Sequence, residues 1–336
     1  MKRLGRYTLL FERRPAILGH AAGCGKKEAA GPLARDFDQT FLDSYLNQES
    51  WEKAESMLQT EAANLAIRKA GLQKQDINMV FAGDLLNQCI SSTFGLRGMD
   101  IPFLGQYGAC STMAQTLIMA SIMVECGAAN YACAVTSSHF CTAERQYRMP
   151  VPYGSQRSPT AQWTATAAGC PLLSAQGPGS YITHVTCGKI VDQGITDPNN
   201  MGAAMATAAY DTLRAYFADT HTGPADYDAI FTGDLGELGH EIVMDLFRQD
   251  GVDMTRNYED CGMLLYDRDR QDMHAGGSGC GCSAAVFNGY LLTGLKQGRW
   301  RRILFAPTGA LLSPTSSFQG ESIPGICHLV CVSTER

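Results

Sequence analysis

The segment DINMVFAGDL at residues 76–85 is repeated, with changes, as DYDAIFTGDL at residues 226–235. Each copy is a short apolar run that ends in a Gly-Asp-Leu turn, as expected for a buried strand that runs into a loop. Two further pairs follow in the same order: Gly108–Cys110 with Asp260–Gly262, and Ala134–Ser138 with Ala306–Ala310. Three matches in one order predict an internal duplication with an insertion in the second half.

Helical and strand-like segments alternate around these repeats. Ser50 is a suitable N-cap for a helix over 51–70, and Gly71 is a suitable stop. Other helices are predicted over 111–126, 238–249 and 283–297, and strands over 77–82, 131–136 and 302–308. Alternation of this kind predicts an α/β protein with a mainly parallel sheet.

Charged residues make up only 18% of the chain, against about 25% in a typical soluble domain. Between Ile101 and Ala143 the only charged residue is Glu125. Gly127 and Asn130 divide the most apolar run into pieces shorter than the roughly 20 residues that cross a bilayer. We therefore expect a buried helix and then a strand covered on both faces. The net charge of −6 argues against a nucleic-acid-binding protein.

The thirteen cysteines could indicate a secreted, disulfide-bonded protein, but no apolar leader segment follows the basic residues at the start. We expect cytoplasmic synthesis, reduced thiols and, since no CxxC pair occurs, no metal site. Cys110, in the turn YGACS at residues 107–111, precedes a long apolar helix. A helix N-terminus lowers a thiol pKa and favours a nucleophile. Cys110 could equally be a small buried residue that serves only to pack a tight turn.

Several segments resemble the thiolase-like condensing enzymes, and more specifically their stage V sporulation protein AD branch. They run in order through almost the whole chain: GPL (31–33), AGDLLNQ (82–88), IPFL (101–104), GACS (108–111), TSSH (136–139), TAERQ (142–146), GITD (194–197), AGGSGCG (275–281), TGALLSPT (308–315) and ESIP (321–324). The first thirty residues and the short C-terminus depart from this pattern. The resemblance implies a duplicated fold layered αβαβα, with halves at 1–185 and 186–336 forming one compact unit.

The resemblance also implies a function other than condensation. Members of this branch are taken to bind dipicolinate (pyridine-2,6-dicarboxylate) and to help move it, with calcium, into the developing spore, beside membrane proteins of the same assembly. Condensing enzymes pair their cysteine with His/His or His/Asn from two loops of the second half. The matching loops here, 232–235 and 277–280, contain neither residue. We therefore expect a non-enzymatic binding protein without a cofactor.

A dipicolinate site needs donors for two carboxylates and an apolar slot for the ring. Amides after Cys110 and around Gly277 and Ser278 can supply donors, and Asn87 can add one from its turn. Three polar side chains just beyond a buried strand can add more: Ser138, His139 and Thr142.

Three charged residues need separate consideration. Arg145 could hold a carboxylate bidentately, or it could pair with Asp84 or Glu144, or face solvent. Asp84 and Asp234 occupy corresponding turns, where they could meet the calcium of a chelate or cap a following helix. We favour capping for at least one of them.

Two other functions stay open from the sequence. One is a thiolase or ketoacyl-synthase-like acyltransferase that uses Cys110, and the other is a structural subunit with a vestigial pocket. The resemblance further implies a homodimer, for which the uncharged strand 131–136 is our predicted edge. It also implies peripheral association with the forespore or spore inner membrane.

Overall fold

A computed structural model describes residues 1–147 and 157–336 of the chain. The main elements of the first half are β3 (Ala16–Cys24), α2 (Trp51–Lys69), β5 (Met79–Gly83), β6 (Phe103–Gly105), α4 (Thr112–Glu125), β7 (Tyr131–Ser138) and β9 (Ala167–Ser174). Those of the second half are β10 (Ser180–Thr186), α6 (Met201–Thr220), β11 (Ala229–Thr232), α7 (Gly236–Gln249), β12 (Tyr258–Asp260), α10 (Cys280–Val286), a π-helix (Phe287–Leu291), α11 (Leu292–Lys296), β14 (Arg302–Ala306) and β17 (Leu329–Ser333).

Shorter elements surround this framework. In the first half they are β1 (Lys2–Leu4), β2 (Thr8–Leu10), α1 (Lys26–Ala29), β4 (Gln39–Thr40), α3 (Ile90–Leu96), α5 (Phe140–Tyr147) and β8 (Trp163–Thr164). In the second half they are α8 (Cys261–Leu265), α9 (Arg268–Gln271), β13 (Gly277–Ser278), β15 (Thr308–Ala310), α12 (Pro314–Phe318) and β16 (Gly325–Cys327). The helix predicted over 51–70 is confirmed, and Ser50 caps it by accepting from the Lys53 amide at 3.3 Å.

The two halves have the same strand order, which confirms the internal duplication. The first half runs β6-β5-β7-β9-β3 and the second runs β12-β11-β14-β17-β10. In each half the first three strands are parallel, and the last two are antiparallel to their neighbours. A short pairing of β3 with β10 joins the halves into one sheet. Because the repeat restarts at Ser180, the division expected at residues 185 and 186 falls inside β10.

Two details of the sequence prediction are wrong. The sheet is mixed rather than mainly parallel, because β9 and β17 run against their neighbours. A strand covered on both faces reads as the same apolar run in either direction. The helix that leads into β14 is α10 and begins at Cys280, so the counterpart of the Cys110 turn is Gly279–Cys280. The segment Asp260–Gly262 instead opens the inserted helix α8.

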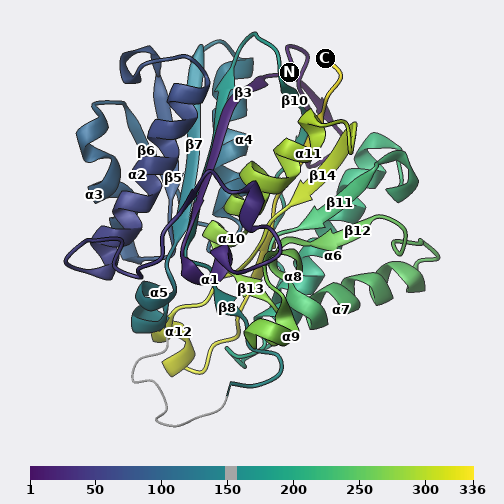
Figure 1. The fold of residues 1–336 in the computed structure, drawn as a ribbon. Helices are drawn as coiled ribbons and strands as arrows, with labels where there is room; N and C mark the ends of the chain where they lie inside the picture. Colours follow the sequence, from purple (N-terminus) through teal and green to yellow (C-terminus); the bar gives the residue numbers. More distant parts are fainter. Residues whose placement is uncertain (148–156) are drawn as a thin grey trace.

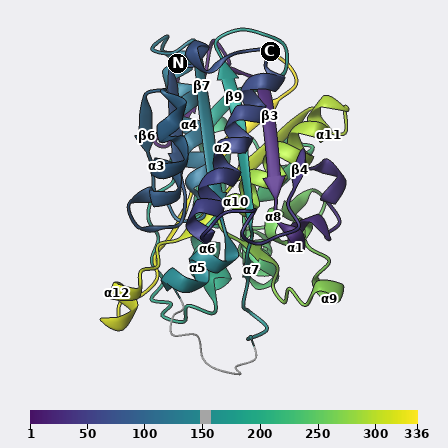
Figure 2. The same ribbon diagram turned by 60° about the vertical axis from the view of Figure 1, so that its left-hand side comes forward.

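Alternate residues of the strands enter different cores, which produces five layers. In β7, Ala132 and Ala134 face a central core with α4 and α10, whereas Cys133 and Val135 face an outer core with α2. In β14, Phe305 faces the central core and Leu304 faces a second outer core with α6 and α7. Figure 1 shows α4 and α10 between the two outer helix layers, and Figure 2 shows α2 lying across β9 and β7. The uncharged stretches are thus the central helices and strands.

The strand predicted as a dimer edge lies in the interior instead, since β7 pairs with β5 on one side and β9 on the other. The free edge of this half of the sheet is β6, where Phe103 and Leu104 are 37% and 49% exposed. Within 1–147 and 157–336, no helix combines the length and the hydrophobicity that a membrane span requires.

Candidate functional site

The Cys110 turn is held tightly by its own hydroxyl groups. The Ser111 hydroxyl donates to the Gly108 carbonyl at 2.7 Å, and the Thr112 hydroxyl accepts from the Gly108 amide at 3.0 Å. Ala109 has a φ of 50°, a left-handed conformation that costs a non-glycine residue roughly 1 kcal/mol or more. This turn places Cys110 two residues before α4, as predicted, with 6% of the residue exposed.

Residues from the second half surround the Cys110 thiol. The Ser278 hydroxyl lies 3.9 Å from Sγ, and the Asp234 carboxyl is close enough for its charge to raise the pKa of the thiol. Asp234 also accepts from the Gly279 amide at 2.9 Å and from the Thr308 hydroxyl at 3.0 Å. The structure therefore brings together three of the predicted residues, Cys110, Asp234 and Ser278.

The electrostatics of this cluster oppose a reactive thiolate. Burial raises the pKa of Cys110 well above its usual value, and the neighbouring charge of Asp234 raises it further. The expectation that a helix N-terminus lowers this pKa is therefore wrong, because desolvation outweighs the helix dipole here. Burial likewise raises the pKa of Asp234 to about 7, so this carboxyl changes charge near neutral pH.

A pocket of about 290 Å³ adjoins the cluster, and it is lined by Asn87, Tyr107, Tyr147 and the segments 86–89 and 311–314. Tyr147 packs against Cys110, Leu85 and Cys280. The hydroxyl groups of Tyr107 and Tyr147 lie 3.0 Å apart. The two tyrosines thus stand between the pocket and the thiol, and neither was among the residues predicted from the sequence.

Asp84 is held in a second buried polar cluster and acts as a cap. It accepts from the Leu86 amide at 2.9 Å, and from the amide and hydroxyl of Ser92 at 2.8 Å and 2.6 Å. Burial raises its pKa. The capping role favoured for one of the two aspartates is confirmed for Asp84.

Glu55 and Gln59 complete this cluster, and sequence reasoning missed both. The Glu55 carboxylate accepts from the Ser137 hydroxyl at 3.2 Å and the Thr142 hydroxyl at 2.7 Å. Gln59 donates to the Ser92 hydroxyl at 3.1 Å. A signal was available, because Glu55 and Gln59 are four residues apart on the helix face that carries Leu58 and Ala62, which is the buried face.

Ser138 and His139 serve internal contacts. The Ser138 hydroxyl donates to the Ala165 carbonyl at 2.7 Å and accepts from the Gly281 amide at 3.2 Å. His139 accepts from the Cys141 amide through Nδ1 and reaches the Ser44 carbonyl through Nε2 at 2.7 Å. Burial lowers the pKa of His139. Both residues, with Thr142, fix the backbone at the end of β7.

Arg145 does not reach the Cys110 cluster. Its guanidinium pairs with Glu52 and lies over the Trp51 ring, 5.3 Å from the centroid, with half of the side chain exposed. The pairing considered with Asp84 or Glu144 is replaced by this contact.

Gly277, another of the predicted site residues, contributes its carbonyl, which accepts from the Gln162 side chain at 3.0 Å.

Comparison with known proteins identifies the family. The family model for stage V sporulation protein AD matches residues 5–333. The curated "Stage V sporulation protein AD" of Bacillus subtilis (strain 168) is 45% identical over 329 residues, which cover 98% of this chain and 97% of that protein. In the described ranges, no three His, Cys, Asp or Glu side chains are grouped so as to hold a metal ion.

Solved structures agree on the fold at low sequence identity. The 3-oxoacyl-[acyl-carrier-protein] synthase III of Aquifex aeolicus VF5 is 12% identical, covers 95% of this chain and 99% of its own, and has a TM-score of 0.60. Cerulenin-bound OleA of Xanthomonas campestris is 13% identical, covers 97% and 98%, and has a TM-score of 0.63. These condensing enzymes confirm the predicted thiolase-like architecture. Taken with the match along almost the whole sequence, they place the chain as a thiolase-fold member of the stage V sporulation protein AD family.

Proposed function

We propose that this chain binds dipicolinate as its calcium chelate, without chemical turnover, for uptake into the developing spore. Family membership supports a role in sporulation. The observation that carries the proposal is the pocket of about 290 Å³ beside the Cys110 cluster, with Asn87 and two tyrosines in its wall. Tyrosine rings offer a flat apolar surface for the pyridine ring, and their hydroxyl groups offer donors for its carboxylates.

The charges of the site favour the chelate over free dipicolinate. The charged groups that raise the pKa of Cys110 and Asp234 are carboxylates, Asp234 itself and Asp260. A free dianion would be repelled by these groups, and Arg145, the predicted clamp, is engaged elsewhere. A calcium ion held by dipicolinate still has open positions for oxygen ligands. Asn87 in the pocket wall can fill one of them. Asp234 is fully buried and does not line the pocket, so it would attract the cation through its charge, and its pKa of about 7 would fall when the cation binds.

The same geometry supports a non-enzymatic role. Cys110 retains its place before α4, but its neighbour from the second half is the acid Asp234, and burial keeps the thiol protonated. An acyl transfer would need a thiolate and a base to assist it. The raised pKa of Cys110 therefore supports the binding role over the acyltransferase alternative.

Calorimetry tests the ligand and the chelate together. We expect the purified chain to bind dipicolinate with calcium, and to bind it at least tenfold more weakly with EDTA. Asp234→Asn removes a buried negative charge near the pocket and should weaken calcium–dipicolinate binding by up to about tenfold. Asp272→Asn, at an exposed position, is the matched control.

Two outcomes would contradict this proposal. Absence of binding with and without calcium would remove dipicolinate as the ligand, and equal binding in both conditions would remove the chelate. Mass spectrometry of the same protein after incubation with an acyl-coenzyme A tests the alternative, since an acyl adduct on Cys110 would support an enzyme. Isophthalate, which lacks the ring nitrogen, is the matched control ligand.

We also propose that the chain forms a homodimer through β6 and acts at the spore inner membrane beside membrane proteins of the same assembly. β6 and the elements next to it in the sequence and the sheet carry six exposed apolar side chains, called the β6 patch: Ile90, Phe94, Phe103, Leu104, Tyr107 and Met119. A second copy that adds its own β6 would pair the free backbone groups and bury this patch.

Sedimentation velocity tests the dimer. Leu104→Lys places a charge in the middle of the patch, and we expect it to raise the dimer dissociation constant at least a hundredfold, because the charge would be buried without a partner. Ile190→Lys changes a more exposed apolar residue in the second half and should leave the dimer intact. A monomeric wild-type chain at micromolar concentration would contradict the proposal.

A further inference from the structure

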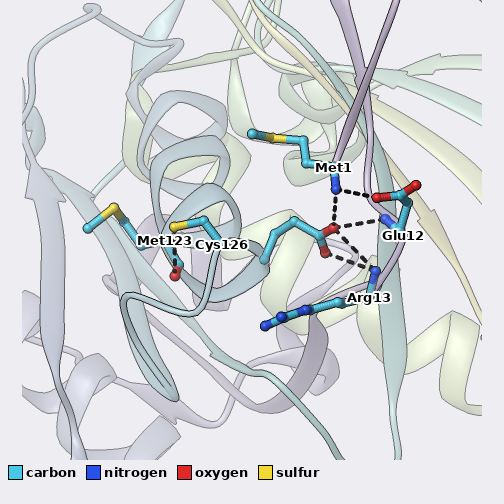
Figure 3. Close-up of polar contacts among 6 residues, drawn as sticks. Met1, Glu12, Arg13, Met123 and Cys126 are labelled. Atoms are coloured by element: carbon cyan, nitrogen blue, oxygen red, sulfur yellow. Dashed lines mark hydrogen bonds and ion pairs between the residues drawn. The ribbon is translucent and has the colours of Figure 1, made fainter.

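Glu125, the single charge in the long uncharged stretch, anchors a loop that carries two arginines. Its side chain is 1% exposed and lies at the end of α4. The carboxylate accepts from the Glu12 amide at 2.9 Å and from the Arg13 amide at 3.2 Å and 3.1 Å (Figure 3). It therefore fixes the backbone between β2 and β3.

The side chain of Arg13 is exposed, and that of Arg14 is half-buried. Figure 3 shows that the Arg13 guanidinium extends away from the Glu12 carboxylate, and the bonds from Arg13 to Glu125 are made by its amide. Arg14 has a φ of 54°, and such a conformation persists only where the surroundings hold it. The anchored backbone thus holds both arginines beside one surface hollow.

These arginines line a hollow of about 680 Å³ together with Glu12, Ala175, Gln176 and Arg336. The Glu12 carboxylate is bonded to the amino group of Met1 at 2.7 Å. In the described part of the chain, no carboxylate forms an ion pair with Arg13, Arg14 or Arg336. Three arginines therefore line one surface hollow of an acidic protein, and the one acidic side chain in its lining, Glu12, is paired with the Met1 amino group.

We propose that Arg13, Arg14 and Arg336 form a binding site for a phosphate-type oxyanion, with Gln176 as an additional donor. The planar fork of each guanidinium matches two oxygens of such a group. The site is separate from the Cys110 cluster, because the two lie at opposite ends of α4, whose fourteen residues span about 21 Å. The phosphate can belong to a free anion or to the headgroup of an anionic lipid.

The experiment measures both sources on the full chain. Phosphatidylglycerol vesicles are compared with phosphatidylcholine vesicles by co-sedimentation, and inorganic phosphate is titrated by calorimetry. Each arginine near an anionic surface contributes about fivefold in affinity, so Arg13→Ala with Arg14→Ala should weaken vesicle binding about 25-fold. The double variant Arg13→Lys with Arg14→Lys keeps both charges and should recover only part of the lost vesicle affinity, because lysine lacks the planar fork of donors.

The controls distinguish a specific site at the hollow from non-specific attraction by surface charge. Arg248→Ala with Arg270→Ala removes two exposed arginines far from the hollow and should bind as the wild type does, and thermal unfolding confirms that each variant is folded. If the wild type binds phosphatidylglycerol vesicles and the Arg13/Arg14 alanine variant does not, the ligand is a lipid headgroup. If the wild type binds inorganic phosphate but not vesicles, and the variant loses the phosphate, the ligand is a free anion. Binding of neither probe, or equal binding by both alanine pairs, would overturn the proposal.

Discussion

Gly281→Ala is expected to destabilise the folded chain by at least about 3 kcal/mol, or to prevent folding. A Cβ at this position would lie 2.3 Å from the Ala167 carbonyl oxygen and 2.6 Å from the Ser138 amide nitrogen. Both atoms belong to the backbone of the central sheet, so no side-chain rotation can relieve the contact. Helix α10 must move away from β7 and β9, and it would take Gly279 from its bond to Asp234.

Denaturant unfolding measures the effect, and Gly223→Ala is the matched control. No atom lies within 4 Å of a Cβ built on Gly223, and its φ of −137° is accessible to alanine. We expect the control to unfold within about 0.5 kcal/mol of the wild type. If Gly281→Ala also unfolded within about 0.5 kcal/mol of the wild type, α10 would not pack on the sheet at Gly281.

The duplication was predictable because short segments of the sequence repeat in the same order in both halves. A strand followed by Gly-Asp-Leu occurs twice, and the helices and strands around each copy were located from apolar spacing and caps. The direction of β9 and β17 was not predictable in the same way. The apolar residues of a strand covered on both faces are the same whichever way the strand runs. The directions of β9 and β17 are set by the connections between strands, which the apolar pattern does not reveal.

The candidate site shows a similar division. Cys110, Asp234 and Ser278 were found because each lies in a small-residue turn at the end of a core element. Arg145 was misplaced because its partner Glu52 is 93 residues away in the sequence, and nothing local indicates that contact. Glu55 was missed for the opposite reason. It lies on the apolar face of a helix, where a carboxylate is expected only when other polar groups meet it.

Glu55 should make the stability of the chain depend on pH near neutrality. Burial and the nearby charge of Asp84 raise the pKa of Glu55 to about 8, from an ordinary value of 4.5. In the unfolded chain this carboxyl loses its proton near its ordinary pKa, whereas in the folded chain it keeps the proton until about pH 8. Its stabilising contribution is therefore complete below pH 4.5 and is lost as the pH rises towards 8.

Glu55→Gln removes this titration while keeping the shape of the side chain and an acceptor oxygen for the hydroxyl groups of Ser137 and Thr142. We expect the variant to match the wild type near pH 4.5 and to become relatively more stable by up to about 1.4 kcal/mol per pH unit up to about pH 8. Denaturant unfolding across this range measures the difference. Glu61→Gln on the same helix, at a partly exposed position, is the matched control. A constant difference between wild type and Glu55→Gln would mean that Glu55 is ionised throughout, so that Ser137 and Thr142 suffice to stabilise a buried charge beside Asp84.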